Sequence, residues 1–158
     1  YEDDTRKVWV ADSFEGLPPP NPQLYPADAG LRLNEVPYLA VSLEQVQNNF
    51  RKYGLLDGQV EFLKGFFRDT LPKAPIEKIS VLRLDGDLYE STMDTLRYLY
   101  PKLSIGGYVI IDDYGAIQAC ARAVHDYRKF FNIQEPMIKV DWTGVYWQKA
   151  KEVDGGDM

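Results

Sequence analysis

Acidic residues follow three short apolar runs of the sequence, at the point where each run ends. They are Asp12, Asp85 and Asp112. Apolar runs of this length are typical of buried strands, and ligands of open α/β sheets bind beyond the carboxyl ends of the strands. An aspartate in such a place can also serve simply as the N-cap of the next helix. The shared position at one rim nevertheless makes the three acids candidates for a common site.

Two of these acids have a second acid close by. Asp87 follows Asp85 by two positions, so the two lie about 6–7 Å apart on one side of an extended chain. If the two strands are parallel neighbours, Asp85 and Asp112 are about 5 Å apart. With Asp113 these carboxylates would repel one another and bind protons, whereas a hard cation such as Mg²⁺ neutralises them and leaves a position for a substrate oxygen. Asp112 and Asp113 point in opposite directions in a regular strand, so both reach one ion only if the strand has already turned.

The sequence offers no competing centre. His125 is the one histidine, and its place inside a helical pattern indicates a structural role. Cys120, the one cysteine, occupies an apolar helical position and is expected in the core. Zinc-type His/Cys clusters, Walker loops and GxGxxG motifs are absent from the sequence. Arg83 stands within an apolar strand, and the sequence gives no reason for it.

The composition is that of one globular domain. The chain has 158 residues, of which 45% are hydrophobic, and these suffice for a sizeable core. A net charge of −6 argues against binding to nucleic acid or to an anionic membrane. No apolar run approaches the roughly 20 residues that cross a bilayer, and no signal peptide is evident. We therefore expect a cytoplasmic protein.

Strand and helix patterns alternate along the chain, which predicts an α/β fold with a mainly parallel sheet covered on both faces. A capping box at Ser42 and Gln45 begins one of the helices. Near the C-terminus, two short strands flank a glycine-containing connection and predict an antiparallel hairpin. Strands are expected at residues 8–11, 60–63, 79–84, 108–111, 137–140 and 145–148, and helices at 43–54, 66–71, 93–103 and 117–131.

The segment 17–40 holds six of the ten prolines and is expected to be irregular. Long loops of this kind often act as lids, and its apolar side chains favour a lid that packs on something. We expect one partial domain over residues 1–150 and a flexible tail over 151–158.

Three motifs, taken in order, resemble the macrocin O-methyltransferase (TylF-like) family. They are VWVADSFEGLP at residues 8–18, LDGDLYEST at 84–92 and IDDYG at 111–115. The resemblance extends over about residues 5–150 and implies a Rossmann-like class I methyltransferase sheet. It also implies S-adenosylmethionine and Mg²⁺, or another divalent cation, as cofactors.

The resemblance assigns a role to each candidate residue. Asp12 would hold the ribose hydroxyls of S-adenosylmethionine, and Asp87 would be the general base. The remaining residues divide into those that line the adenosine pocket (Ser13, Phe14, Gly65, Phe66) and those that bind the metal (Asp85, Asp112, Asp113).

The implied reaction is methylation of a hydroxyl on a sugar or a glycosylated natural product. A cation acidifies and orients such a hydroxyl, and a carboxylate takes its proton as the methyl group transfers. The acceptor would be a small molecule, and the sequence leaves homo-oligomerisation open. The first strand and the glycine-rich cofactor loop of the fold are missing from the sequence, and we expect them to precede Tyr1.

Three alternatives remain open. The same metal chemistry would serve a catechol or phenol O-methyltransferase. Asp85-Gly86-Asp87 alone would also suit a DxD-type glycosyltransferase that binds a sugar nucleotide. A truncated module without cofactor, which only binds a partner, is the non-catalytic alternative.

Overall fold

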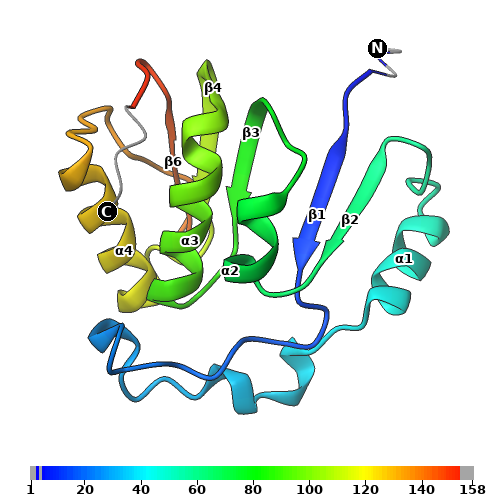
Figure 1. Ribbon diagram of the computed structural model, residues 1–158, viewed down its shortest axis with the longest axis horizontal. Helices are drawn as coiled ribbons and strands as arrows, with labels where there is room; N and C mark the ends of the chain where they lie inside the picture. The colour runs from blue at the N-terminus through cyan, green and yellow to red at the C-terminus, as the bar shows by residue number, and fades with distance from the viewer. Residues whose placement is uncertain (1–2, 4, 154–158) are drawn as a thin grey trace. The chain divides into compact units, whose positions relative to one another are not determined.

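The computed structural model describes residue 3 and residues 5–153. The described residues form six strands with helices between them along the chain, and Figure 1 labels most of these elements. The strands are β1 (Val8–Asp12), β2 (Val60–Lys64), β3 (Ile79–Leu84), β4 (Leu103–Ile111), β5 (Ile138–Lys139) and β6 (Val145–Gln148). The α-helices are α1 (Leu43–Lys52), α2 (Phe67–Thr70), α3 (Tyr89–Leu99) and α4 (Gln118–Phe130), and the 3-10 helices are η1 (Pro26–Asp28), η2 (Leu33–Glu35), η3 (Pro37–Leu39), η4 (Leu71–Lys73) and η5 (Tyr100–Lys102).

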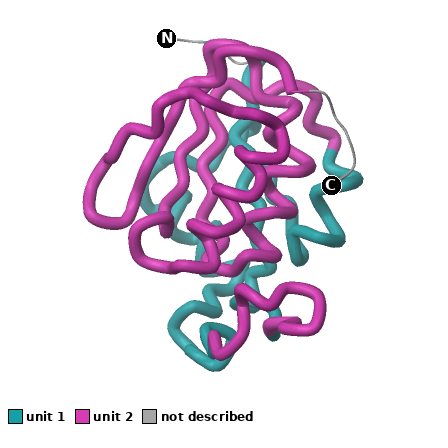
Figure 2. Tube along the Cα trace, turned by 90° about the vertical axis from the view of Figure 1, so that its left-hand side faces the viewer, with its two compact units in different colours: residues 1–19, 32–74 teal, residues 20–31, 75–158 magenta. Residues whose placement is uncertain are grey.

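The chain is divided into two compact units, coloured separately in Figure 2. Unit 1 comprises residues 1–19 and 32–74, and unit 2 comprises residues 20–31 and 75–158. The expectation of one partial domain over 1–150 stays a prediction. The expected tail over 151–158 lies mostly outside the described residues.

Unit 1 is built on a parallel strand pair. β1 pairs with β2 in a register that sets Val10 opposite Phe62 and Asp12 opposite Lys64. The rings of Phe14 and Phe50 both lie about 6 Å from that of Phe62, with centroid distances of 6.2 and 5.8 Å. The Ser42 hydroxyl accepts the Gln45 N–H at 3.2 Å, so the predicted N-cap of α1 is confirmed.

Unit 2 contains a four-stranded sheet in the order β3-β4-β6-β5. β3 and β4 are parallel neighbours, as the spacing of the acids requires, and β6 is antiparallel to both β4 and β5. The predicted C-terminal hairpin is thus confirmed. β4 begins at Leu103, five residues before the predicted start, because Gly106 and Gly107 continue the strand. A Cβ on Gly107 would lie 2.8 Å from the Ser80 carbonyl oxygen of β3, so the close approach of the two strands requires glycine there.

Helices α3 and α4 pack together and cover one face of this sheet (Figure 1). That face is apolar and buried, and its strand residues are Leu82, Leu84, Val109, Ile111, Val145 and Trp147. The opposite face differs from the expectation of a sheet covered on both sides. Val81 is 59% exposed and Tyr108 is 42% exposed, so the described part of the chain leaves this face open to solvent.

The proline-rich segment 17–40 is irregular, as expected, apart from the short helices η1, η2 and η3. Its middle part, residues 20–31, belongs to unit 2, and the flanking parts belong to unit 1. Its role as a lid stays a prediction. Within the described residues, none of the helices has the length and apolar character needed to cross a membrane.

Candidate active site

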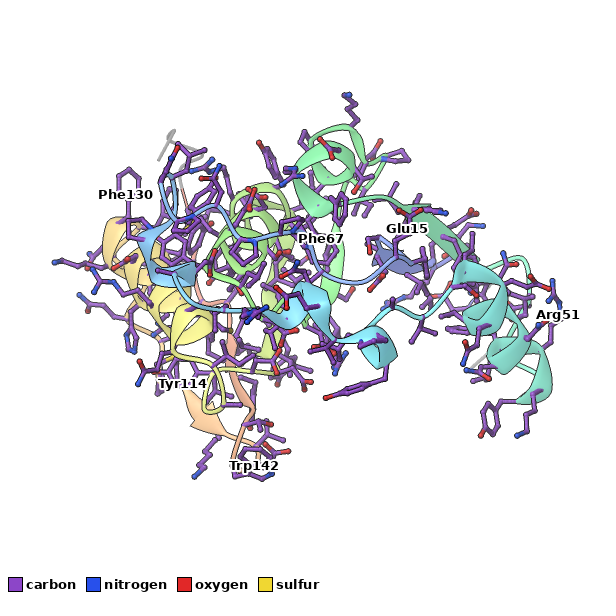
Figure 3. The ribbon with its side chains drawn as sticks, turned by 90° about the horizontal axis from the view of Figure 1, so that it is seen from below. Glu15, Arg51, Phe67, Tyr114, Phe130 and Trp142 are labelled. Atoms are coloured by element: carbon purple, nitrogen blue, oxygen red, sulfur yellow. The ribbon has the colours of Figure 1, made fainter. Side chains whose placement is uncertain are left out.

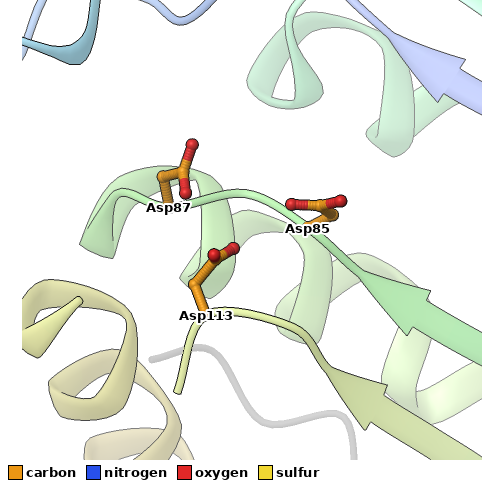
Figure 4. A group of neighbouring side chains, drawn as sticks. All are labelled: Asp85, Asp87 and Asp113. Carbon is orange, nitrogen blue, oxygen red and sulfur yellow. The ribbon is translucent and has the colours of Figure 1, made fainter. Parts of the chain in front are cut away.

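Three carboxylates of unit 2 meet beyond the ends of β3 and β4 (Figure 4). Asp85 and Asp87 lie in the turn between β3 and α3, and Asp113 lies in the turn after β4. Each offers an oxygen, and these oxygens lie within 4.8 Å of one another. The backbone of Asp87 has a φ of 56°, a left-handed conformation that aspartate tolerates better than most residues. The predicted convergence of acids from two separate parts of the chain is therefore observed.

The crowding changes how these acids bind protons. Burial, together with the charges of the neighbouring carboxylates Asp87 and Asp85, raises the pKa of Asp113 to about 7. The pKa of Asp87 is also raised, first by burial and then by the charges of Asp85 and Asp112, although a hydrogen bond with Asp113 opposes the rise. Around neutral pH, and without a cation, the group therefore retains a proton that isolated carboxylates would lose.

The donor set fits a hard divalent cation. It consists entirely of carboxylate oxygens, which are the ligands that Mg²⁺ and Ca²⁺ prefer. One side-chain oxygen of Asp113 is buried and has no hydrogen-bond partner, and such an atom is costly unless something binds it. A cation held by Asp85, Asp113 and a further acid would both satisfy this oxygen and remove the repulsion.

Asp112 is not part of the group of three. Its N–H continues the ladder by donating to the Leu84 carbonyl at 2.9 Å, so the chain is still strand-like at this residue. Its carboxylate binds Arg83 at 2.9 Å, and the same guanidinium nitrogen binds Asp85 at 2.9 Å. Burial alone would lower the pKa of Arg83, but the charges of Asp85 and Asp112 outweigh it and raise that pKa. The adjacent acids Asp112 and Asp113 thus have different partners.

Helix α4 contacts both acidic turns. The Tyr89 hydroxyl, two residues beyond Asp87, donates to Asp126 at 3.3 Å. The Tyr114 hydroxyl, next to Asp113, lies 2.8 Å from His125 Nε2. These two bonds come from consecutive residues of α4, so the helix holds the two turns beside each other. The structural role expected of His125 agrees with this contact.

Aromatic side chains lie around the turn that follows β4. Figure 3 shows Tyr114 and Trp142 in neighbouring parts of unit 2. The segments that carry them are joined by the Gly115 N–H, which donates to the Thr143 carbonyl at 2.6 Å. Trp142 is 76% exposed. A half-buried ring next to Asp113 and an exposed ring in the adjoining segment suit the binding of a sugar or an aromatic acceptor.

Asp28 connects the proline-rich segment to the acidic turn of β3. It is fully buried, and its carboxylate accepts the N–H groups of Tyr89 at 2.6 Å and Glu90 at 3.2 Å. These N–H groups belong to the first turn of α3, which offers them no acceptor within the helix and where a negative charge is favourable. Asp28 therefore caps, from 61 residues away, the helix that begins just after Asp87.

The predicted cofactor residues gather in unit 1, at the carboxyl ends of β1 and β2. Asp12 Oδ1 accepts the Phe14 N–H at 2.5 Å, and the Ser13 hydroxyl donates to the Gly16 carbonyl at 2.5 Å. The Gly65 N–H donates to the Asp12 carbonyl at 2.9 Å, so the two turns adjoin. Phe66 follows directly and precedes α2. All five candidates thus lie at one edge of unit 1.

Two backbone conformations in these turns are unusual. Phe14 has a φ of 57°, which is rare for a bulky residue and is found mainly where function requires it. Gly65 has a φ of 140°, and a Cβ there would lie 2.6 Å from the Thr70 methyl group. Only glycine fits at position 65, and the turn after β2 is therefore fixed by its sequence.

Sequence reasoning missed two residues of the site, Arg83 and Asp28. Arg83 was noticed as a charged residue in an apolar strand, two positions before Asp85, but no partner for it was predicted. Asp28 gave no signal, because its partners are distant in the sequence. Cys120 was interpreted correctly as a core residue: it is buried, and burial raises the pKa of its thiol to about 12.

Comparison with solved structures defines the class of fold. The structure of the O-methyltransferase NovP matches 93% of this chain with a TM-score of 0.90 and 54% sequence identity. The calicheamicin methyltransferase CalS11 matches 93% of the chain with a TM-score of 0.70 at 20% identity, and this likeness concerns the fold alone. The fold is that of the class I methyltransferases.

The sequence matches Macrocin-O-methyltransferase (TylF) over residues 1–149, and the chain belongs to that family. It is 57% identical over 149 residues to the 8-demethyl-8-(2,3-dimethoxy-alpha-L-rhamnosyl)-tetracenomycin-C 4'-O-methyltransferase of Streptomyces olivaceus. It is 50% identical over 153 residues to the mycinamicin III 3''-O-methyltransferase of Micromonospora griseorubida.

These matches include 94% and 95% of this chain, but 57% and 60% of the two relatives. NovP is matched over 61% of its chain. The chain therefore spans somewhat more than half the length of the relatives that it resembles.

Proposed function

We propose that this protein is an S-adenosylmethionine- and divalent-metal-dependent O-methyltransferase that acts on a hydroxyl of a sugar or a glycosylated natural product. The observation that carries the proposal is the group Asp85, Asp87 and Asp113 at the end of β3 and β4, in a chain of the macrocin O-methyltransferase family. The names of two relatives, which refer to a rhamnosyl tetracenomycin and to mycinamicin III, support a glycosylated acceptor.

The proposed cation is Mg²⁺ or a similar ion, held by Asp85 and Asp113 together with Asp112. When bound, it supplies a Lewis acid that lowers the pKa of the acceptor hydroxyl and orients it toward the sulfonium methyl group. The unpaired Asp113 oxygen and the raised pKa of this carboxyl support the assignment.

Asp87 is proposed as the general base. Its carboxylate stands beside Asp85 and Asp113, and burial raises its pKa, which makes it a better proton acceptor than an ordinary aspartate. As the methyl group moves from sulfur to the acceptor oxygen, Asp87 takes the hydroxyl proton. The contacts of Tyr89 with Asp28 and Asp126 hold the turn that carries this base.

Asp12 is proposed to hold the ribose of the cofactor. One of its oxygens accepts the Phe14 N–H, which orients the carboxylate within its turn. A carboxylate accepts hydrogen bonds from two vicinal hydroxyls, and these charge-assisted bonds are stronger than neutral ones. Ser13, Phe14, Gly65 and Phe66 are proposed to surround the adenosine.

An acceptor screen with the full-length protein tests the function. Macrolide and aminocoumarin glycosides, with their aglycones and simple catechols as matched controls, are incubated with labelled S-adenosylmethionine. Methyl transfer is followed by mass spectrometry, with Mg²⁺ and with a chelator. We expect transfer to glycosides that stops when the chelator is added and resumes with Mg²⁺. Transfer to catechols in preference to glycosides would contradict the acceptor class, and activity insensitive to the chelator would contradict the metal.

A further inference from the structure

Arg83 forms ion pairs with two of the acids that follow β3 and β4, Asp85 and Asp112. A single guanidinium nitrogen lies 2.9 Å from Asp85 and 2.9 Å from Asp112. Asp85 also belongs to the group of three carboxylates. Arg83 therefore binds one member of that group and the neighbouring acid that stands outside it.

The strand register explains this arrangement. Arg83 and Asp85 are two positions apart, so they point to the same side of β3. Arg83 is paired with Ile110 of β4, and Asp112 follows Ile110 by two positions, which places Asp112 on the same side as Arg83. Asp113 points to the other side, toward Asp87. The sheet thus directs one of the two adjacent acids to the arginine and the other to the carboxylate group.

An ordinary surface ion pair is the simpler interpretation of these contacts. Exposed pairs contribute little to stability, and the side chain of Arg83 is 54% exposed. Two features favour a role in the site. The guanidinium bridges two carboxylates that come from different strands, and both of them are proposed ligands of the cation. A cation bound to these two carboxylates would lie close to the guanidinium and be repelled by its charge, so the cation and the arginine oppose each other's binding.

We propose that Arg83 competes with the divalent cation, holding Asp85 and Asp112 in the metal-free protein and releasing them when the cation binds. The inference rests on the metal site of the proposed function. It makes Arg83 a positioning residue, since it acts through the two carboxylates. It also explains how Asp112 serves as a ligand although it stands outside the group of three in this structure.

Metal titration of the full-length protein and three variants tests the proposal. Mn²⁺ serves as the probe, and binding is measured by calorimetry and by the electron paramagnetic resonance signal of free Mn²⁺. Arg83→Gln removes the competing charge, and we expect it to bind Mn²⁺ at least about tenfold more tightly than the wild type. Arg83→Lys keeps the charge, and we expect its affinity to stay within about threefold of the wild type.

Arg6→Gln is the matched control. Arg6 forms an ion pair of 2.8 Å with Asp3 in unit 1, so this variant loses an arginine–aspartate pair of similar length outside the carboxylate group. We expect its Mn²⁺ affinity to equal that of the wild type. Equal or weaker binding by Arg83→Gln, or equally tight binding by Arg83→Gln and Arg83→Lys, would overturn the proposal.

A measurement on the wild type avoids any folding defect of the variants. The side-chain nitrogen signal of Arg83 in an NMR spectrum should shift when Mg²⁺ is added, whereas that of Arg6 should stay in place. An unmoved Arg83 signal in protein that binds Mg²⁺ would refute the exchange while leaving the metal site intact. If neither the wild type nor Arg83→Gln binds Mn²⁺, the proposed metal dependence itself fails.

Discussion

The acid at the end of β1 and the acids at the ends of β3 and β4 have corresponding places in two parallel strand pairs, but different surroundings. In unit 1, Asp12 accepts the N–H of its own turn at 2.5 Å and faces Lys64 across the ladder. In unit 2, Asp85, Asp87 and Asp113 face one another within 4.8 Å. Unit 1 presents a single carboxylate. Unit 2 presents three carboxylates that repel one another unless protons or a cation neutralise part of their charge.

This difference indicates what each site can bind. A single oriented carboxylate accepts hydrogen bonds from neutral hydroxyls and needs no metal. Burial and mutual repulsion raise the pKa values of Asp87 and Asp113, and a crowded group of this kind gains most from a divalent cation, because the cation removes the repulsion. The two units therefore suit the two halves of the proposed reaction, cofactor binding in unit 1 and acceptor activation in unit 2. Variants of each site should affect one half and spare the other.

The largest effect is expected from the unit 2 acids. Asp85→Ala and Asp87→Asn should each reduce kcat/KM for methyl transfer about a thousandfold, since one removes a proposed ligand and the other removes the proposed base. Calorimetry should show unchanged affinity for S-adenosylhomocysteine. Wild-type methyl transfer by either variant would remove the assigned role of that residue.

Asp12→Ala should have the complementary effect. The loss of two charge-assisted hydrogen bonds to the ribose should weaken the binding of S-adenosylhomocysteine by about tenfold to a hundredfold. Mn²⁺ binding should be unchanged, because Asp12 lies outside the carboxylate group. A matching loss of metal affinity would show that the two sites are not separate.

Asp28→Ala should destabilise unit 2 by about 2 kcal/mol, because two N–H groups of the first turn of α3, one buried and one half-buried, lose this acceptor. Asp57→Ala is the control in unit 1, since the exposed carboxylate of Asp57 accepts the Gln59 N–H at 2.8 Å in a local turn. Denaturant unfolding of both variants gives the comparison. Equal losses of unfolding free energy would mean that the buried cap contributes no more than an exposed turn.

The last prediction concerns pH. Asp113 has its pKa raised to about 7 in the folded protein, against about 4 when unfolded. The folded state thus binds more protons between these values, and the metal-free protein should lose stability as pH rises from about 4 to about 7. Metal binding requires the ionised form, so Mn²⁺ affinity should rise about tenfold from about pH 6 to about pH 8.

Thermal unfolding at several pH values, with and without Mg²⁺, measures both trends. Asp113→Asn should flatten the pH dependence of the metal-free protein. A wild-type protein that gains stability over this range without metal would contradict the raised pKa.

Much of this arrangement follows from local sequence. The strands that precede Asp12, Asp85 and Asp112 were predicted from apolar runs. Ligands of open sheets bind beyond the carboxyl ends of strands, and this rule marked the three acids as candidate site residues. The N-cap of α1 at Ser42 was predicted from a four-residue pattern and is confirmed. Signals of this kind are contained within a few neighbouring residues.

The other features of the site are contacts between residues that are far apart in the sequence, and local patterns do not predict such pairs. The alternation of a strand predicted that Asp112 and Asp113 diverge, but it did not identify Arg83 as the partner of Asp112. The cap of α3 by Asp28 depends on the fold of a segment 61 residues away. The sheet face that bears Val81 and Tyr108 was expected to be covered, since strands and helices alternate along the chain, but it is exposed. Alternation alone does not tell on which face of the sheet each helix packs.

The bond from Asp28 to Tyr89 also has a consequence for the order in which the chain folds. Residues 20–31 belong with α3 and α4, yet the elements of residues 32–74 lie between them in the sequence. During synthesis, at roughly 5–20 residues per second, this segment therefore waits several seconds for its partners. Contacts of such high sequence separation also slow folding. Unit 2 should thus be the last part of the described chain to become complete.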